Sequence, residues 1–297
     1  MTDWDAAVTS MAGVLGGDLR SALAEVALAR ERPYFDAEAD QAAAEAYYAN
    51  VSLDRLGDLV ESTHTVKLGY KPAKELYPWV DLQPDGRLRS LYTAHVFEPE
   101  DLILADFEVL QARVARLMRA TMLGDGGRAK IEAEVEAELP FNCEHVVPQS
   151  WFGKAEPMRG DLHHLFACES GCNSFRGNTP YAEFADFPEA PSPGGLSVMD
   201  VVRGDCGKRQ SGGFEPANGK GAAARAACYF RLRYPKQISV EEMPDDRWEV
   251  VLGWHEQDPV TLWERHRNAA IFERQGNRNP FIDHPAWLED MAASLPR

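Results

Sequence analysis

At Asn142 the residue composition and the apolar periodicity of the sequence change, and this change limits the architectures that the chain can adopt. Before it, apolar residues recur at helical spacing, as at Leu19 and Leu23, and residues 104–138 form the clearest stretch of this kind. After it, His, Asn, Cys and Gly become dense and the periodicity weakens. We therefore expect helices in the first half of the chain, two or three of them within residues 1–62, and an irregular segment that begins near Asn142.

Helical and extended segments alternate further downstream. Residues 216–234 are expected to form a basic helix, residues 237–252 to contain a strand, and residues 257–275 to form a further helix. The Pro/Gly-rich segment 187–195 predicts an exposed loop. In the last helix, the predicted inward residues are Leu262, Trp263, Ala270 and Ile271, and the predicted exposed residues are Arg265, Arg267 and Arg274.

The charge of the chain is unevenly distributed. The formal net charge is −16, which argues at first against an acidic polymer as partner. Residues 1–140 carry 14 basic against 25 acidic side chains, whereas residues 200–236 carry 8 against 3. This segment is a candidate phosphate-facing patch, although chance clustering on a solvated helix face explains the pattern as well. Its basic residues are Arg203, Lys208, Arg209, Lys220, Arg225, Arg231, Arg233 and Lys236.

The chain has five cysteines, an odd number that fits a reducing compartment better than a disulfide framework. Buried thiols that pack as small hydrophobic groups are the default interpretation. A structural zinc site on Cys168 and Cys172 with Cys143 or Cys206 is an alternative, and so is a local disulfide.

The amino-terminal segment MTDWDAAVTSM has no basic region followed by an apolar stretch, so no ordinary secretory signal is visible. No apolar run reaches the length of about 18 residues that a membrane helix needs. We expect a protein that is cytoplasmic or exported by a non-classical route, with no membrane partner.

Three short segments after Asn142 carry residues suited to phosphodiester hydrolysis. That reaction needs a group that takes a proton from water, and a neutral His can do so near neutral pH. It also needs the charge on phosphorus and on the leaving oxygen to be stabilised, which a divalent cation on oxygen ligands can do. His145 stands beside Glu144, and a short hairpin would bring His145 to a helix on which Asn173 and Arg176 share a face. The segments are 142–148, 160–165 and 172–178.

The strings EHVVPQSWFG, GDLHHL and NSFRGN, in this order, resemble the bacterial endonuclease I family of nonspecific His-Me finger (ββα-metal) nucleases. The resemblance continues in YKPAKELYPWVDLQPDGRLRSLYT, GGFEP, the basic segment 224–234 and QDPVTLWERHRN…QGNRNPFIDHP, and thus covers most of residues 65–290. It implies an α+β fold with a mainly helical body around a small ββα-metal motif. Residues 1–62 would be a helical extension, and residues 63–297 a catalytic domain with a helical insert at about 96–138.

The resemblance also implies roles for single residues. His145 would be the general base, and Glu144 and Asn173 would bind a metal ion, Mg²⁺ first, with Mn²⁺ and Ca²⁺ as alternatives. Arg176 would contact a phosphate oxygen or brace the helix. His163, His164 and Asn178 would support these groups, although each could equally serve only to fix the loop.

Two features of the sequence complicate this assignment. Successive side chains of a regular strand point to opposite faces, so Glu144 and His145 can serve one site only if the strand ends or kinks there. The family places a phosphate-binding Arg between the hairpin strands, and here Arg159 and Lys154 are the basic candidates. The residues proposed to contact nucleic acid are Arg159, Lys208, Arg209, Lys220 and Arg225.

The leading hypothesis is a metal-dependent, sequence-nonspecific endonuclease that acts on DNA, with RNA as a further substrate. Such an enzyme inside a cell would call for an inhibitor protein or for restricted expression. The first alternative is a non-catalytic, zinc-stabilised binding or regulatory protein on the same fold. The second is a hydrolase of a smaller phosphodiester. The sequence does not indicate the oligomeric state.

Overall fold

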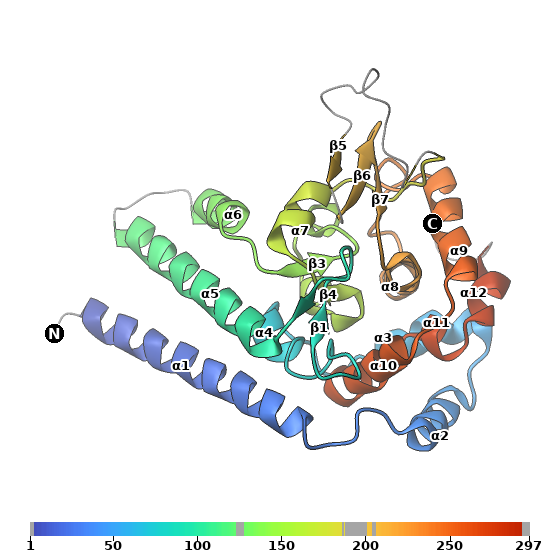
Figure 1. Ribbon diagram of the computed structural model, residues 1–297, viewed down its shortest axis with the longest axis horizontal. Helices are drawn as coiled ribbons and strands as arrows, with labels where there is room; N and C mark the ends of the chain where they lie inside the picture. Colours follow the sequence, from blue (N-terminus) through green and yellow to red (C-terminus); the bar gives the residue numbers. More distant parts are fainter. Residues whose placement is uncertain (1–2, 123–127, 186, 188–200, 204–205, 293–297) are drawn as a thin grey trace.

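The computed structural model describes residues 3–122, 128–185, 187, 201–203 and 206–292. In these residues helices predominate, and the strands pair in three small antiparallel sheets, so the predicted α+β class is confirmed (Figure 1). None of the helices in this part of the chain combines the length and apolar character needed to cross a bilayer. Apart from residue 187, the loop predicted at 187–195 lies outside the described residues.

The first half of the chain is helical, as predicted. The two longest helices, α1 and α5, run beside each other through buried side chains that include Val26 and Ile103 (Figure 1). The side chain of Asp36 accepts a hydrogen bond from the backbone of Ala39 and so caps the start of α2. The elements are α1 (Asp3–Ala29), α2 (Ala37–Tyr48), η1 (Leu53–Arg55), α3 (Leu56–Thr63), α4 (Pro72–Glu75), β1 (Leu88–Arg89), β2 (Val96–Phe97), α5 (Pro99–Met122) and α6 (Arg128–Glu138).

The centre of the molecule is a two-stranded hairpin followed by a short helix. Strand β3 pairs with β4 so that Glu144 lies opposite Phe166 and His145 opposite Leu165. Three single-turn helices occupy the connection between the strands, and α7 follows β4. The elements are β3 (Cys143–His145), η2 (Gln149–Phe152), η3 (Met158–Gly160), η4 (Leu162–His164), β4 (Leu165–Ala167) and α7 (Ser170–Arg176).

The hairpin lies between two hydrophobic cores. Cys143 and Leu165 belong to a core built with α1, α4 and α5, whereas Phe166 and Val146 belong to a core built with α3, α8 and α9. Alternate side chains of a strand point to opposite faces, so both faces of this hairpin are buried. The same alternation decides which side of the hairpin each candidate site residue occupies.

A three-stranded sheet and five helices form the described carboxy-terminal part. The helices predicted within 216–234 and 257–275 are confirmed, but the strand predicted within 237–252 is wrong. Trp248, Val251 and Trp254 recur at helical spacing and form the buried face of α9, which packs on α8. The elements are β5 (Val201–Arg203), β6 (Gly207–Gln210), β7 (Gly213–Pro216), α8 (Lys220–Arg233), α9 (Asp245–Gln257), α10 (Leu262–Gln275), α11 (Pro280–Asp283) and α12 (Ala286–Met291).

Two residues of α10, Leu262 and Arg267, differ in solvent exposure from the prediction. Ala270 and Ile271 are buried as expected, but Leu262 is 49% exposed because it opens the helix immediately after the capping residue. Arg267, predicted to be exposed, is buried and forms an ion pair with Asp81. A buried arginine requires such a partner, because desolvation of an unpaired charge is strongly unfavourable.

Candidate active site

His145 ends strand β3 in a buried aromatic setting. Its ring lies 4.5 Å from the ring of Tyr70 and 5.3 Å from that of His164, measured between centroids. Its Nε2 lies 3.0 Å from the carbonyl oxygen of Arg159. A carbonyl oxygen only accepts hydrogen bonds, so Nε2 must carry the proton and Nδ1 keeps a lone pair. Burial lowers the pKa of His145 well below its usual value, and the neighbouring His164 acts in the same direction.

His145 lines a cleft of about 290 Å³. The structure brings Asn173 and Asn178, two of the other predicted site residues, into the walls of the same cleft. The remaining walls come from Tyr70, from the helices of the predicted insert and from the segment that follows β3. The further lining residues are Arg113, Glu136, Ala137, Pro140, Phe141, Pro148, Gln149, Ser150, Ser174 and Gly177.

Glu144 points to the opposite side of β3, as strand alternation requires. Its Oε1 accepts hydrogen bonds from Arg176 and from the hydroxyl of Tyr92, at 2.9 Å for the latter. Its Oε2 is buried and has no hydrogen-bond partner. Burial raises the pKa of Glu144, and the guanidinium of Arg176 opposes this shift. Glu144 is 1% exposed and is not among the residues that line the cleft.

Asn173, on α7, is held against the backbone of β3. Its Nδ2 donates a 2.6 Å hydrogen bond to the carbonyl oxygen of Cys143, which leaves its Oδ1 as the remaining acceptor. Glu144 Oε2 and Asn173 Oδ1 are a carboxylate and an amide oxygen, the donor types that Mg²⁺ and Ca²⁺ prefer. The unpartnered Oε2 is an atom that a cation would satisfy, so the donor types of these two residues fit a hard divalent ion, although the side chain of Glu144 lies on the other side of β3 from His145. Within the described residues, no group of three or more His, Cys, Asp or Glu side chains could hold a metal.

Arg176 braces the hairpin. It is fully buried, pairs with Glu144, and donates to the carbonyl oxygens of His145 at 2.9 Å and Val146 at 2.8 Å. The sequence left two roles open for Arg176, contact with a phosphate oxygen and bracing of the helix, and these contacts correspond to bracing. Contact with a phosphate would require a guanidinium that is accessible from the solvent.

The two histidines of η4 hold the connection between the strands. His164 Nε2 donates to the carbonyl oxygen of Met158 at 2.6 Å, and its ring contacts that of His145. The ring of His163 packs against that of Tyr229 in a tilted arrangement, 4.3 Å apart between centroids. Both therefore fix the loop, and His164 also supports the ring of His145. Asn178 is exposed in the wall of the cleft.

The carboxylate of Asp161, at the start of η4, organises the region behind the two histidines. It is completely buried and accepts hydrogen bonds from Tyr229, Tyr234 and Gln275. Burial alone would raise the pKa of Asp161, but the nearby imidazoles and the bond from Gln275 outweigh burial and lower it below its usual range. Asp161 was not among the predicted site residues, because its partners Tyr229, Tyr234 and Gln275 lie far away along the chain.

Part of the predicted basic patch is buried. Lys208, Arg225 and Arg233 are at most 6% exposed. Arg225 donates to both oxygens of Glu264, at 2.6 and 3.0 Å. The prediction that Arg225 and Lys208 contact nucleic acid is therefore wrong, because neither side chain reaches the surface.

Arg209 and Lys220 are partly buried and engaged with other protein groups. Arg209 donates to the carbonyl oxygen of Phe175 at 2.7 Å, and Lys220 Nζ lies 2.6 Å from Glu215. Neither residue is among those that line the His145 cleft. Their contact with nucleic acid stays a prediction.

Two tyrosines in the neighbourhood of the site were not predicted. Tyr70 packs on the ring of His145 and lines the cleft, and Tyr92 holds the carboxylate of Glu144. Both lie at the ends of the stretch Tyr70–Thr93 that resembles the endonuclease I family. That resemblance was the one signal that could have pointed to these two tyrosines. Their positions along the chain do not reveal that Tyr70 lies near His145 and Tyr92 near Glu144.

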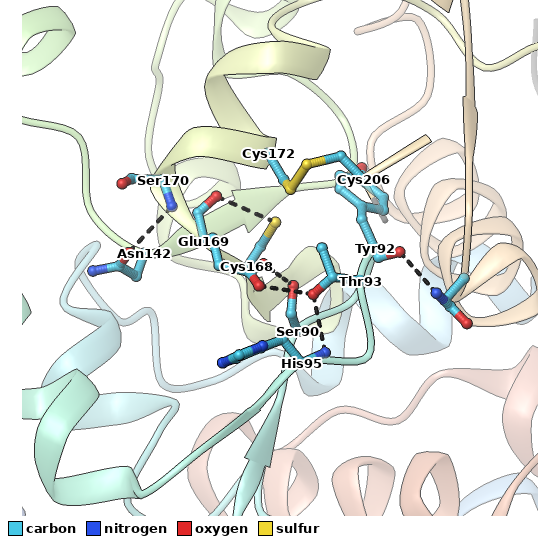
Figure 2. The surroundings of a disulfide bond; sticks show 11 residues. Ser90, Tyr92, Thr93, His95, Asn142, Cys168, Glu169, Ser170, Cys172 and Cys206 are labelled. Atoms are coloured by element: carbon cyan, nitrogen blue, oxygen red, sulfur yellow. Dashed lines mark hydrogen bonds between the residues drawn. A yellow bond between two sulfur atoms is a disulfide. The ribbon is translucent and has the colours of Figure 1, made fainter. Parts of the chain in front are cut away.

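A disulfide joins Cys172 of α7 to Cys206, next to β6 (Figure 2). A local disulfide was one of the alternatives open from the sequence, and this bond uses Cys172, which both possible zinc sets include, and Cys206, which one of them includes. Cys143, Cys168 and Cys228 are free and buried, as the default interpretation expected. In Figure 2 the thiol of Cys168 lies beneath the disulfide, at the start of the segment that leads into α7.

Reduction of this disulfide is expected to lower the free energy of unfolding by about 3–4 kcal/mol. The bond joins residues 34 positions apart and restricts the unfolded chain accordingly. Urea unfolding with and without a thiol reductant measures the difference. The double variant Cys172→Ala/Cys206→Ala is the control and should not respond to the reductant. An unchanged midpoint for the wild type under reducing conditions would show that the bond contributes nothing.

Comparison with known proteins finds related nucleases. An extracellular ribonuclease of Bacillus amyloliquefaciens is 32% identical over 168 residues, which are 51% of this chain and 53% of that protein. An extracellular deoxyribonuclease of Aeromonas hydrophila is 31% identical over 170 residues, 50% of this chain and 68% of that protein. A periplasmic deoxyribonuclease of Aeromonas hydrophila is 29% identical over 160 residues, 47% of this chain and 62% of that protein.

The chain spans about half the length of the Bacillus ribonuclease. The family model for endonuclease I matches residues 120–286, a range that includes the hairpin, α7 and helices α8 to α11. This is more than half of the 297 residues. The chain therefore belongs to the endonuclease I family.

Proposed function

We propose that this protein is a metal-dependent endonuclease that hydrolyses DNA, with RNA as a second substrate, and that it does not select a base sequence. The observation that carries the proposal is the state of His145, a neutral imidazole whose free Nδ1 lone pair belongs to a cleft also lined by Asn173. The relatives include both deoxyribonucleases and ribonucleases, which supports a nucleic acid as substrate.

In this proposal His145 is the general base. The carbonyl oxygen of Arg159 fixes the Nε2–H tautomer, so a water molecule in the cleft can give its proton only to Nδ1. Tyr70 and His164 pack on the ring and hold its orientation. Strands β3 and β4 with helix α7 would then correspond to the ββα-metal motif of the family.

The proposed metal ligands are Glu144 and Asn173. Mg²⁺ is the first candidate, with Mn²⁺ or Ca²⁺ as alternatives, because both ligand atoms are oxygens. When bound, such an ion supplies positive charge that stabilises the phosphorane and the leaving oxygen. Arg176 pairs with Glu144 and opposes the rise that burial causes in the pKa of its carboxyl group, and the carbonyl oxygen of Cys143 orients the amide of Asn173. The disulfide weakens the zinc-stabilised alternative, because it removes the thiolate of Cys172, a member of both possible zinc sets.

Removal of divalent metal is expected to abolish cleavage. Supercoiled plasmid incubated with the protein and Mg²⁺ should be nicked and then linearised, whereas excess EDTA should stop the reaction and added Mg²⁺ should restore it. Cleavage should also weaken steeply with salt, because nonspecific binding depends on phosphate contacts. Full activity in EDTA would contradict the proposal. Stoichiometric zinc in an inactive protein would instead favour the non-catalytic alternative.

A further inference from the structure

The segment predicted as a helical insert reaches the cleft of His145. Helix α6 lies close to α7 in Figure 1, and Glu136 and Ala137 line the same cleft as His145 and Asn173. This segment therefore forms one wall of the candidate active site.

Glu136 bridges the two basic residues of the connection between β3 and β4. Its Oε1 accepts a hydrogen bond from the guanidinium of Arg159, and its Oε2 accepts one from the ammonium of Lys154. The carboxylate is 18% exposed, and the side chains of Arg159 and Lys154 are 27% and 41% exposed. Both basic groups therefore lie near the surface, but each forms an ion pair with the carboxylate of Glu136.

Arg159 is tied to the candidate general base as well. Its carbonyl oxygen accepts the hydrogen bond from His145 Nε2, while its Nε donates to Gln149 at 2.8 Å. The guanidinium that meets Glu136 therefore belongs to the residue that sets the tautomer of His145. An anion held by this guanidinium lies at the edge of the cleft that contains the base.

A carboxylate and a phosphate compete for the same donors. Guanidinium groups bind both anions through paired N–H donors, and an ammonium group binds both as a point charge. We infer that Glu136 is a specificity-determining residue whose carboxylate occupies the place of a substrate phosphate on Arg159 and Lys154. This inference rests on the proposed nuclease function. A polymer can displace Glu136 because it makes several phosphate contacts at once, whereas a small phosphodiester cannot.

The inference predicts tighter binding without faster chemistry when Glu136 is neutralised. Glu136→Gln should lower the Kd for a single-stranded oligonucleotide about tenfold, since two partly exposed ion pairs no longer oppose binding. The slope of log Kd against log salt should steepen by about one to two units as both cations become available to phosphates. In steady-state cleavage KM should fall and kcat should stay the same.

Binding is measured by fluorescence anisotropy in a His145→Ala background, so that no substrate is consumed. Glu138→Gln is the matched control, because Glu138 lies on the same helix and pairs only with the exposed Arg116 among described residues. Glu138→Gln should leave Kd, KM and the salt slope unchanged. The double variant Glu136→Gln/Arg159→Gln should lose most of the gain in affinity, since the freed guanidinium produces it.

An unchanged or weaker affinity of Glu136→Gln would overturn the inference, because the carboxylate would then only position Arg159. A gain that persists in the double variant with Arg159→Gln would overturn it too. If Glu136→Gln does not fold, Glu136→Asp carries the same comparison, since a shorter side chain cannot bridge both cations and should give a smaller gain. The proposed function has a separate readout. If Glu136→Gln binds more tightly but the protein with an intact His145 does not cleave, the proposed nuclease function is wrong, whereas the inference about Glu136 still holds.

Discussion

Replacement of His145 by alanine is expected to lower kcat for plasmid nicking by about 10²–10⁴-fold and to leave nucleic-acid affinity nearly unchanged. The imidazole keeps the lone pair of Nδ1 at neutral pH, because its pKa is lowered by burial and Nε2–H is committed to the carbonyl oxygen of Arg159. A general base contributes to the transition state and little to the ground state, so the loss should appear in kcat.

The control is His95→Ala, which removes an exposed imidazole outside the cleft. Its kcat and KM should match those of the wild type. Plasmid nicking at several enzyme concentrations, together with anisotropy measurements of binding, separates the two parameters. Wild-type kcat in His145→Ala would exclude His145 as the base. A loss confined to binding would assign the residue to substrate contact.

Replacement of Arg176 by methionine is expected to lower the free energy of unfolding by about 3–5 kcal/mol. The variant leaves the carboxylate of Glu144 buried without a counter-charge and leaves the carbonyl oxygens of His145 and Val146 without a donor. Because Arg176 ends α7 and its partners lie on and just after β3, the same change loosens the contact between the helix of Asn173 and the strand of His145.

Chemical denaturation measures this loss, and Arg116→Met provides the comparison. Arg116 pairs with Glu138 on the surface, where both side chains are at least half exposed, so its replacement should change stability by no more than about 1 kcal/mol. The double variant Glu144→Gln/Arg176→Met should recover part of the stability lost in Arg176→Met, since no charge remains buried. A loss below about 1 kcal/mol in Arg176→Met would show that this ion pair does not hold the hairpin.

Local patterns were sufficient for most helices and for the residues that the hairpin and α7 bring to the cleft. Apolar spacing predicted the helices on both sides of Asn142, and the three short segments around His145, His164 and Asn173 indicated one site. The β-branched residues within 237–252 predicted a strand, and this prediction was wrong. The packing of α9 on α8, with Trp248 and Trp254 on its buried face, overrode the local preference for a strand.

By itself the sequence determined the family, the α+β class and the set of polar residues from which the site is built, because these depend on residue type and order. The tertiary structure decided which of those residues face the cleft. Strand alternation separates Glu144 from His145, and long-range partners bury Arg176 and Arg225. Glu136 reaches the cleft of His145 through the fold alone. Ion pairs between distant segments depend on packing in three dimensions, and no spacing along the chain encodes that.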